Sequence, residues 1–299
     1  MGICEGRVVI VTGAGRGLGR AHALEFARQG AKVVVNDLGV ALDGSSAESP
    51  AAGVVEEIRA AGGEALADGA DVADWAQVQQ LLRRTLDTFG GLDVVVNNAG
   101  FVRDRMFVSC SEEEWDAVLR VHLKGHFCLS RLAAEHWRGR AKAGRPVAAR
   151  IINTSSGAGL RGSMGQSAYS AAKAGIAALT LVQAAELGRY GITANAIAPA
   201  ARTRMTEAFF AETMAKPESG FDAMAPGNVS PLVVWLGSAE SQEVTGRCFE
   251  LSGGEICLND GWRMGPKRSR DSRWEADEVG AAVHELLRES APAEPVHGA

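Results

Sequence analysis

The chain has 299 residues, and its 31 basic and 36 acidic side chains give a formal net charge of −5 at pH 7. Hydrophobic residues make up 46% of it, which excludes a disordered protein, because disordered chains lack the apolar side chains that offset the entropy of ordering. The acidic balance argues against nucleic acid as a partner, since a protein that neutralises phosphates needs a basic face.

Runs of β-branched residues alternate with helical patterns along the chain. Nearly continuous apolar runs predict buried strands at residues 7–12, 32–37, 93–97, 150–154 and 192–197, with weaker candidates at 64–69 and 248–251. Helical periodicity lies between them, at residues 18–29, 51–61, 74–89, 112–138 and 167–188. This alternation predicts an α/β fold with a doubly wound parallel sheet of about seven strands and helices on both faces.

The chain is predicted to form one domain followed by an extension. No linker divides residues 1–264, so we expect a single domain there. Within it, residues 204–226 are rich in Met, Phe and Glu with weak periodicity, and they are interpreted as a lid over a ligand site. Residues 265–299 form a C-terminal extension in which one helix is expected near residues 274–289.

A glycine-rich turn, TGAGRGLG, follows the first predicted strand and opens the first helix. Gly13 permits a tight turn, Gly17 lets the backbone approach a pyrophosphate, and Gly19 lets the helix pack against the strand. The helix N-terminus then offers unpaired N–H groups to phosphates. The turn, including Arg16 and Leu18, is therefore predicted to bind a dinucleotide.

Asp37, at the end of the second predicted strand, is the expected contact for the adenosine ribose. A carboxylate there accepts hydrogen bonds from ribose hydroxyls and repels a 2′-phosphate, which favours NAD over NADP. Arg16 gives a weaker argument for NADP, because its cation could meet that phosphate. Asp71 and Val72, after the third strand, fit contacts to the adenine, although a turn or N-cap aspartate explains Asp71 equally well.

Tyr169 and Lys173 form the sharpest chemical signal in the sequence. Residues four apart share one face of a helix, so the lysine lies beside the tyrosine. A neighbouring ammonium, together with the positive nicotinamide of an oxidised cofactor, favours phenolate and lowers the tyrosine pKa, which fits a proton relay for an alcohol and ketone pair. Ser156 follows the fifth strand, at the sheet edge where open α/β proteins bind ligands, and its hydroxyl could bind a substrate oxygen. The adjacent Ser155 is the competing candidate.

The sequence Asn-Asn-Ala-Gly closes the fourth predicted strand at the same edge of the sheet. It is either a polar turn or a place where Asn97, Ala99 and Gly100 let a cofactor pass. With the glycine turn, Ser156 and the Tyr-x3-Lys pair, in this order, it resembles the short-chain dehydrogenase/reductase family over about residues 5–255. The resemblance implies a single-domain Rossmann fold and nicotinamide-dependent interconversion of alcohols and ketones.

The resemblance also implies a role for each residue of the chemical centre. Tyr169 would be the general acid and base, Lys173 would hold the nicotinamide ribose and tune Tyr169, and Ser156 would polarise the carbonyl. A nucleotide-sensing binding protein on the same fold has no need of the tyrosine and lysine pair, so an enzyme is favoured.

Three further residues carry expectations that come from the resemblance. His122 stands where the wider family usually has asparagine in its fourth helix, which implies a modified proton relay. A histidine packed in the helix interface is the alternative. Pro199 and Thr203 follow the sixth strand and are expected cofactor contacts, with Thr203 near the carboxamide.

Residues 35–39, 103–105, 121–125 and 197–206 point to one branch of the family. They resemble the (3R)-hydroxyacyl-CoA dehydrogenase domain of peroxisomal multifunctional enzyme type 2, also called 17β-hydroxysteroid dehydrogenase type 4, and its bacterial single-domain relatives. The resemblance implies a 3-hydroxyacyl-CoA substrate, including bulky or steroid-derived chains. A hydroxysteroid or another secondary alcohol is the alternative, and a 3-oxoacyl reductase is less favoured because Asp37 favours NAD.

The remaining expectations concern location and partners. The five cysteines form no C-x2-C pair, which predicts neither a disulfide framework nor a metal site. No apolar run reaches the roughly 18 residues of a membrane span, and residues 1–6 have no basic leader pattern, so a cytoplasmic protein is expected. The apolar residues in the helices at 112–138 and 167–188 suit a homodimer or homotetramer. The basic stretch at 267–273 either binds coenzyme A phosphates or faces solvent, the second being favoured.

Overall fold

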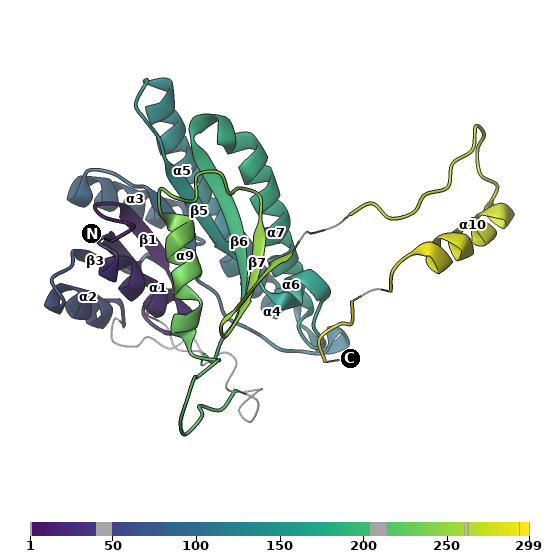
Figure 1. Ribbon diagram of the computed structural model, residues 1–299, viewed down its shortest axis with the longest axis horizontal. Helices are drawn as coiled ribbons and strands as arrows, with labels where there is room; N and C mark the ends of the chain where they lie inside the picture. Colours follow the sequence, from purple (N-terminus) through teal and green to yellow (C-terminus); the bar gives the residue numbers. More distant parts are fainter. Residues whose placement is uncertain are drawn as a thin grey trace.

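One eight-stranded sheet, with strand order β3-β2-β1-β4-β5-β6-β7-β8, forms the centre of the molecule (Figure 1). The computed structural model describes residues 2–39, 50–203, 214–259, 261, 263–292 and 294–298. The strands are β1 (Val8–Thr12), β2 (Lys32–Asn36), β3 (Ala65–Asp68), β4 (Val94–Asn97), β5 (Ala149–Thr154), β6 (Ile192–Ala200), β7 (Cys248–Ser252) and β8 (Glu255–Asn259). The α-helices are α1 (Gly17–Arg28), α2 (Pro50–Ala60), α3 (Trp75–Phe89), α4 (Glu112–Leu119), α5 (Gly125–Lys142), α6 (Gly157–Arg161), α7 (Ser167–Leu187), α9 (Ser230–Gly237) and α10 (Ala276–Glu289).

The sheet is parallel from β3 to β7, and β8 pairs with β7 in the antiparallel direction. The predicted doubly wound α/β fold is therefore confirmed, with one added edge strand. The edge strand was missed because its residues are largely exposed and its apolar run, at residues 256–258, is only three residues long. Strand order reverses between β1 and β4, and open α/β sheets bind ligands at the carboxyl ends of the strands at such a reversal.

Both faces of the central strands β1, β2, β4, β5 and β6 are buried, which explains their continuous apolar runs. In β1, Val9 and Val11 pack under one layer of helices, whereas Val8 and Ile10 pack under the other. Helices α1, α2 and α9 supply side chains to the first layer, and α3, α5 and α7 cover the second. The indole of Trp137 donates a hydrogen bond of 2.7 Å to the Leu92 carbonyl and ties α5 to the start of β4.

The helix expected at residues 112–138 is interrupted by a π-helical turn, η2 (Arg120–Lys124), between α4 and α5. Ser111 and Glu114 form a capping box at its start. The π turn inserts one extra residue into the helix, which is a frequent feature of functional sites. It turns His122, which is 1% exposed, toward the interior. Hydrophobic periodicity does not reveal such a turn, because apolar residues continue on both sides of it.

The C-terminal extension stands away from the sheet and then returns to it (Figure 1). Within the extension, Arg268 forms ion pairs with Glu285 and Glu289 of α10, and Arg270 pairs with Glu278. The chain comes back at His297, whose carbonyl accepts a hydrogen bond of 2.9 Å from the Met164 N–H. Two of the basic residues considered for coenzyme A phosphates are thus already bound by carboxylates of the extension.

None of the helices in the described ranges is long and apolar enough to cross a membrane. The expected lid at residues 204–226 lies partly outside the described residues, which resume at Met214. From there the chain is held to the body: the Arg202 guanidinium pairs with Asp222, and the Arg202 N–H donates to the Met224 carbonyl at 2.7 Å.

Candidate active site

A cavity of about 440 Å³ opens at the carboxyl ends of β1, β2, β4, β5 and β6. Most of the residues predicted from the sequence line it. They are Gly13, Arg16, Gly17, Leu18, Asp37, Asp71, Val72, Ala99, Gly100, His122, Tyr169, Lys173, Pro199 and Thr203. Segments from across the chain therefore meet at one site, as expected for a dinucleotide and a substrate bound side by side.

Three predicted residues are not part of the cavity lining. Gly19 packs behind the glycine turn, where an added Cβ would lie 2.2 Å from the Gly13 carbonyl oxygen. The amide of Asn97 points into the protein interior and donates to Ser130 at 2.8 Å and to Asn153 at 2.9 Å. The Asn97 amide therefore joins β4 to β5 and α5, and a direct contact of Asn97 with the cofactor stays a prediction. Ser156 lies just outside the lining.

Asn98 is a residue that the sequence interpretation missed. Its side-chain amide donates to the carbonyls of Thr12 at 2.9 Å and Gly13 at 3.2 Å, which fastens the glycine turn to the end of β4. Gly13 has a φ of +61°, a conformation that glycine adopts without strain. An added Cβ there would lie 2.8 Å from the Cα of Ala99. The turn is a close-fitting backbone cradle, which fits the pyrophosphate of a dinucleotide.

Asp37 is held rigidly at the rim of this cradle. Its two carboxylate oxygens accept backbone hydrogen bonds of 2.9 Å, one from Gly15 and one from Gly39. Each oxygen retains a further lone pair for a ribose hydroxyl. Arg16, the residue directly before α1, lines the same cavity. Both Asp37 and Arg16 are therefore placed where a bound cofactor can contact them.

We expect Asp37→Asn to change the choice of cofactor more than the affinity for cofactors in general. Removing the charge loses a charge-assisted hydrogen bond to the ribose of NADH, an effect of about tenfold in affinity. The same change relieves repulsion of the 2′-phosphate and strengthens NADPH binding. Fluorescence titration with NADH and NADPH gives the ratio of their dissociation constants. The matched control is Asp116→Asn, which removes the charge of an exposed aspartate. An unchanged NADH to NADPH ratio would contradict the role of Asp37.

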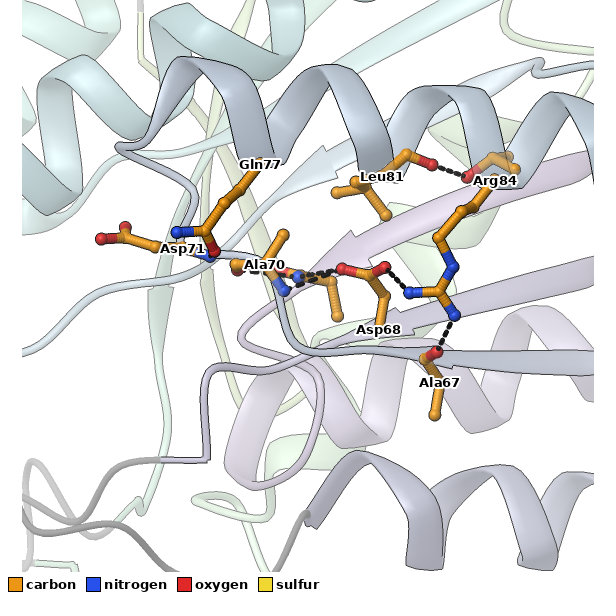
Figure 2. A network of polar contacts seen from close by, with 9 residues as sticks. Ala67, Asp68, Ala70, Asp71, Gln77, Leu81 and Arg84 are labelled. Carbon is orange, nitrogen blue, oxygen red and sulfur yellow. Dashed lines mark hydrogen bonds and ion pairs between the residues drawn. The ribbon is translucent and has the colours of Figure 1, made fainter.

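The turn that carries Asp71 and Val72 is fixed by polar contacts of the buried Asp68 carboxylate. Figure 2 shows Asp68 between the Arg84 guanidinium and the backbone of Ala70, with the Asp71 carboxylate pointing away. The Asp68 carboxylate accepts from Arg84 at 2.5 Å and from the Ala70 N–H at 2.8 Å. Since Asp68 is 5% exposed, its charge needs these partners. The cluster holds the β3–α3 turn against the cavity.

Asp71 itself has structural partners at that turn. One of its oxygens accepts from the Ala73 N–H at 2.9 Å, and the other pairs with Arg120 at 2.5 Å. Val72 lines the cavity and packs against Gly125, where a Cβ would lie 2.8 Å from the valine methyl group. Asp71 therefore stabilises this turn, as one of the two interpretations of the sequence expected. Its contact with the adenine stays a prediction.

Helix α7 places Tyr169 and Lys173 on one face, as the spacing predicts. The Lys173 ammonium lies 5.5 Å from the centre of the Tyr169 ring and donates to the Thr154 carbonyl at 2.6 Å. Burial lowers the pKa of Lys173 to about 7. The lysine thus loses its proton much more readily than an exposed lysine.

The chain's own groups raise the pKa of Tyr169. Burial disfavours the phenolate, a hydrogen bond with the Ser156 side chain opposes this shift, and the charge of Asp104 adds to it. The sequence argument did not include the cost of burying the phenolate. Its other element, the positive nicotinamide of a bound oxidised cofactor, acts to lower this pKa and stays a prediction.

The two candidate serines have different partners. The Ser155 hydroxyl is buried and donates to the Lys173 carbonyl at 2.8 Å, so it holds β5 to α7. The Ser156 hydroxyl caps α6 by accepting from the Ala158 N–H at 3.2 Å, and it also reaches Tyr169. Ser155 lines the cavity, but its hydroxyl is committed to the Lys173 carbonyl, so the assignment of Ser156 to a substrate oxygen stays a prediction.

His122 combines a packing role with a place in the site. Its ring lies edge-on to that of Tyr169, with ring centres 5.2 Å apart. Its Nε2 is 2.6 Å from the Phe101 carbonyl, and its Nδ1 has no hydrogen-bond partner within the described residues. Burial and the charge of Lys173 lower its pKa to about 3. The imidazole is therefore neutral. Its Nε2 also lies 3.0 Å from the Phe101 N–H, so the tautomer decides whether the unpartnered Nδ1 is a donor or an acceptor beside Tyr169 and Lys173.

Buried histidines predict a loss of stability in mild acid. The pKa of His22 and that of His122 are each lowered to about 3, and that of His126 is also well below 6.5. In the unfolded chain each titrates near 6.5, so below this pH the unfolded state binds more protons. The free energy of unfolding then falls by about 1.4 kcal/mol per pH unit for each histidine.

Urea unfolding between pH 7 and pH 5 measures this slope. His22→Asn should make it shallower, because one buried titrating group is removed. The matched control is His284→Asn, which changes an exposed histidine of α10. Equal slopes for the parent and the His22 variant would contradict the prediction.

Comparison with known proteins agrees with the motif order. Residues 7–213 match the short chain dehydrogenase family. The chain is 46% identical over 290 residues to hydroxyacyl-CoA dehydrogenase ChsB1 of Mycobacterium tuberculosis, covering 95% of this chain and 89% of that protein. It is 47% identical over 253 residues to peroxisomal multifunctional enzyme type 2 of Mus musculus, covering 84% of this chain and 32% of that larger protein.

Two crystal structures are also similar. A short chain dehydrogenase from Mycobacterium avium is 62% identical with a TM-score of 0.91, and the match covers 100% of both chains. A short chain dehydrogenase from Mycobacterium paratuberculosis bound to NAD is 26% identical with a TM-score of 0.73, covering 85% of this chain and 98% of that one.

Proposed function

The chain belongs to the short-chain dehydrogenase family and is an oxidoreductase acting on CH–OH groups, and from this premise we propose that it is an NAD-dependent (3R)-hydroxyacyl-CoA dehydrogenase. The observation that carries the proposal is the joint placement of Tyr169, Lys173 and the Ser156 hydroxyl beside a dinucleotide cradle. The names of the hydroxyacyl-CoA dehydrogenase relatives support the substrate class.

The chemistry assigned to these residues is a proton transfer coupled to hydride transfer. Bound NAD supplies the hydride acceptor. Ser156 donates a hydrogen bond to the substrate oxygen, and the Tyr169 oxygen takes the alcohol proton as the carbonyl forms. Lys173 lies beneath Tyr169 and accepts or holds a proton near neutral pH, since its pKa is about 7. In the reverse direction Tyr169 returns the proton to the oxygen of the ketone.

Exposed apolar side chains near the start of α7 support a long or bulky acyl chain. Met106, Phe107, Val108 and Met164 are exposed on the segments that flank Gly165 and Gln166 beside the site. Such a group of apolar side chains is typical of a surface that binds an apolar ligand. A hydroxysteroid or another secondary alcohol is the second candidate, because the same apolar rim suits it.

Oxidation of NADH with a panel of 3-oxoacyl-CoA thioesters tests the substrate class. The panel runs from acetoacetyl-CoA to a thioester with a steroid side chain. Turnover of any thioester supports the proposal, and the preferred acyl chain indicates the size and shape of the substrate pocket. Binding of NADH without turnover of any thioester would refute the acyl-CoA proposal and direct the search to steroid and terpenoid alcohols.

The proposal extends to partners and location. Phe127, Leu181 and Val182 lie exposed on α5 and α7, and apolar helix faces of this kind support a symmetric contact with a second copy of the chain. The proposed location is the cytoplasm, where reduced cysteines are usual.

A further inference from the structure

Helix α6 is short, and the serine proposed to bind the substrate oxygen stands at its start. The helix has five residues, Gly157–Arg161, and Ser156 is its N-cap, with the hydroxyl accepting from the Ala158 N–H at 3.2 Å. A helix this short is not stable by itself, because forming the first turn costs more free energy than its few hydrogen bonds return. Contacts with the rest of the protein therefore fix α6 and, with it, the position of Ser156.

An ion pair ties the last residue of α6 to the sheet. One nitrogen of the Arg161 guanidinium donates to Glu250 Oε2 at 2.9 Å, and another is hydrogen-bonded to Oε1. Glu250 is the middle residue of β7, between Ala198 of β6 and Cys257 of β8. The side chains of Arg161 and Glu250 are only 20% and 26% exposed. A two-fold arginine and carboxylate contact of this kind fixes orientation as well as distance.

The same carboxylate also meets the start of α6. An added Cβ at Gly157 would lie 3.2 Å from Glu250 Oε1 and 3.1 Å from an Arg161 nitrogen. The Nε2 atom of His297 is 3.0 Å from that Cβ position. Three side chains from distant parts of the sequence thus meet over the backbone of Gly157, directly after Ser156. We call the cluster of Arg161, Glu250 and His297 the α6 clamp.

Backbone contacts hold His297 in the clamp. Its N–H donates to the Gly162 carbonyl at 3.2 Å, and its carbonyl accepts from the Met164 N–H at 2.9 Å. It also pairs with Ser163 as an isolated parallel bridge. The end of the chain therefore lies along the segment that leaves α6 (Figure 1). The returning extension thus packs against the same helix that Ser156 caps.

We propose that Glu250 is a positioning residue for Ser156, acting through Arg161 and the backbone of Gly157. The inference rests on the proposed role of Ser156 as hydrogen-bond donor to the substrate oxygen. The carboxylate contacts α6 at both of its ends, which holds the capping serine in one orientation. A donor contributes most to the rate when it is already aimed at the place where charge develops. Loss of the Glu250 charge should therefore slow the chemical step more than it weakens substrate binding.

Hydrogen exchange tests the α6 clamp without any substrate. Glu250→Gln keeps the size of the side chain and replaces a charge-assisted contact with a neutral one. We expect the backbone N–H groups of residues 158–162 to exchange at least about fivefold faster in the variant, because α6 opens more often. The matched control is Glu285→Gln, which removes a carboxylate from an ion pair with Arg268 in the C-terminal extension and should leave exchange in α6 unchanged.

Kinetics tests whether the α6 clamp acts through the serine. In single turnovers of the NADH-bound enzyme with a 3-oxoacyl-CoA, Glu250→Gln should lower the rate about three- to tenfold, with a change in KM of less than about twofold. In a Ser156→Ala background the same substitution should have little further effect, since the hydroxyl that the clamp positions is absent.

Unchanged exchange in α6, or losses of rate from Glu250→Gln and Ser156→Ala that multiply independently, would overturn the inference. A slow Ser156→Ala enzyme beside a Glu250→Gln enzyme at the parental rate would also overturn it and leave the proposed function intact. A Ser156→Ala enzyme at the parental rate would refute the proposed role of Ser156 and this inference with it. Faster exchange, with a loss of rate only where Ser156 is present, supports the inference.

Discussion

Replacing Tyr169 with phenylalanine should abolish turnover and leave the fold and NADH binding intact. In the proposed mechanism the hydroxyl gives and takes the proton of the substrate oxygen. The ring is held by α7 and lies beside His122 and the Lys173 ammonium. Phenylalanine keeps those ring contacts. Positioned acid and base groups contribute about 10²- to 10⁴-fold to rates, so a loss of at least that size is expected in kcat, with little change in the Kd for NADH.

The natural control for this variant is Tyr190→Phe, because Tyr190 is the second tyrosine of the chain and lies at the end of α7 within η3 (Gly188–Tyr190). Steady-state kinetics gives the rate, and NADH fluorescence gives the binding. A Tyr169→Phe enzyme with more than about a tenth of the parental rate would remove Tyr169 from the acid and base role. Loss of NADH binding would instead indicate that the phenol supports the cofactor.

The local parts of the site follow from short stretches of sequence. The glycine turn is predictable because backbone freedom at Gly13 and close packing at Gly19 are properties of the residue type itself. The pairing of Tyr169 with Lys173 follows from helical periodicity alone. The strands could be found because burial on both faces leaves continuous apolar runs.

Features that depend on tertiary contacts could not be found in this way. Asn97 and Asn98 look alike in sequence, yet one amide faces the interior and the other holds the glycine turn. The π turn at His122 interrupts a helix whose apolar pattern is continuous. The hydrogen bond from Gln166 to Asp104 joins residues 62 positions apart, a distance over which spacing carries no information.

The direction of a pKa shift is the clearest example of this limit. Sequence shows which charges are near one another on a helix, but it does not show how deeply each is buried. For Tyr169, burial outweighs the effect expected from the lysine. For Lys173, burial removes much of the positive charge on which that expectation depended.

Lys173→Met is expected to cost activity and to increase stability. The ammonium is 2% exposed, and the Thr154 carbonyl is its hydrogen-bond acceptor. Such a buried charge is unfavourable for folding, whereas methionine fills similar space without charge. We expect kcat to fall by at least about 10²-fold and the thermal midpoint at pH 7 to rise by about 2 °C or more. Activity assays and calorimetry measure the two effects, with the exposed Lys142→Met as control.

The dependence of stability on pH gives the sharper test. In the unfolded chain the lysine holds its proton up to its ordinary pKa of 10.5, whereas the folded chain releases it near pH 7. Between these values the unfolded state binds more protons, so the parental free energy of unfolding should rise with pH across this window. Lys173→Met removes this contribution and flattens the curve. The charge of Lys173 also lowers the pKa of His122 and His126, so the variant should lose less stability in acid. The contrary result is a variant that is less stable than the parent at pH 7 and whose free energy of unfolding changes with pH as in the parent between pH 7 and pH 10. It would show that the buried Lys173 stabilises the fold.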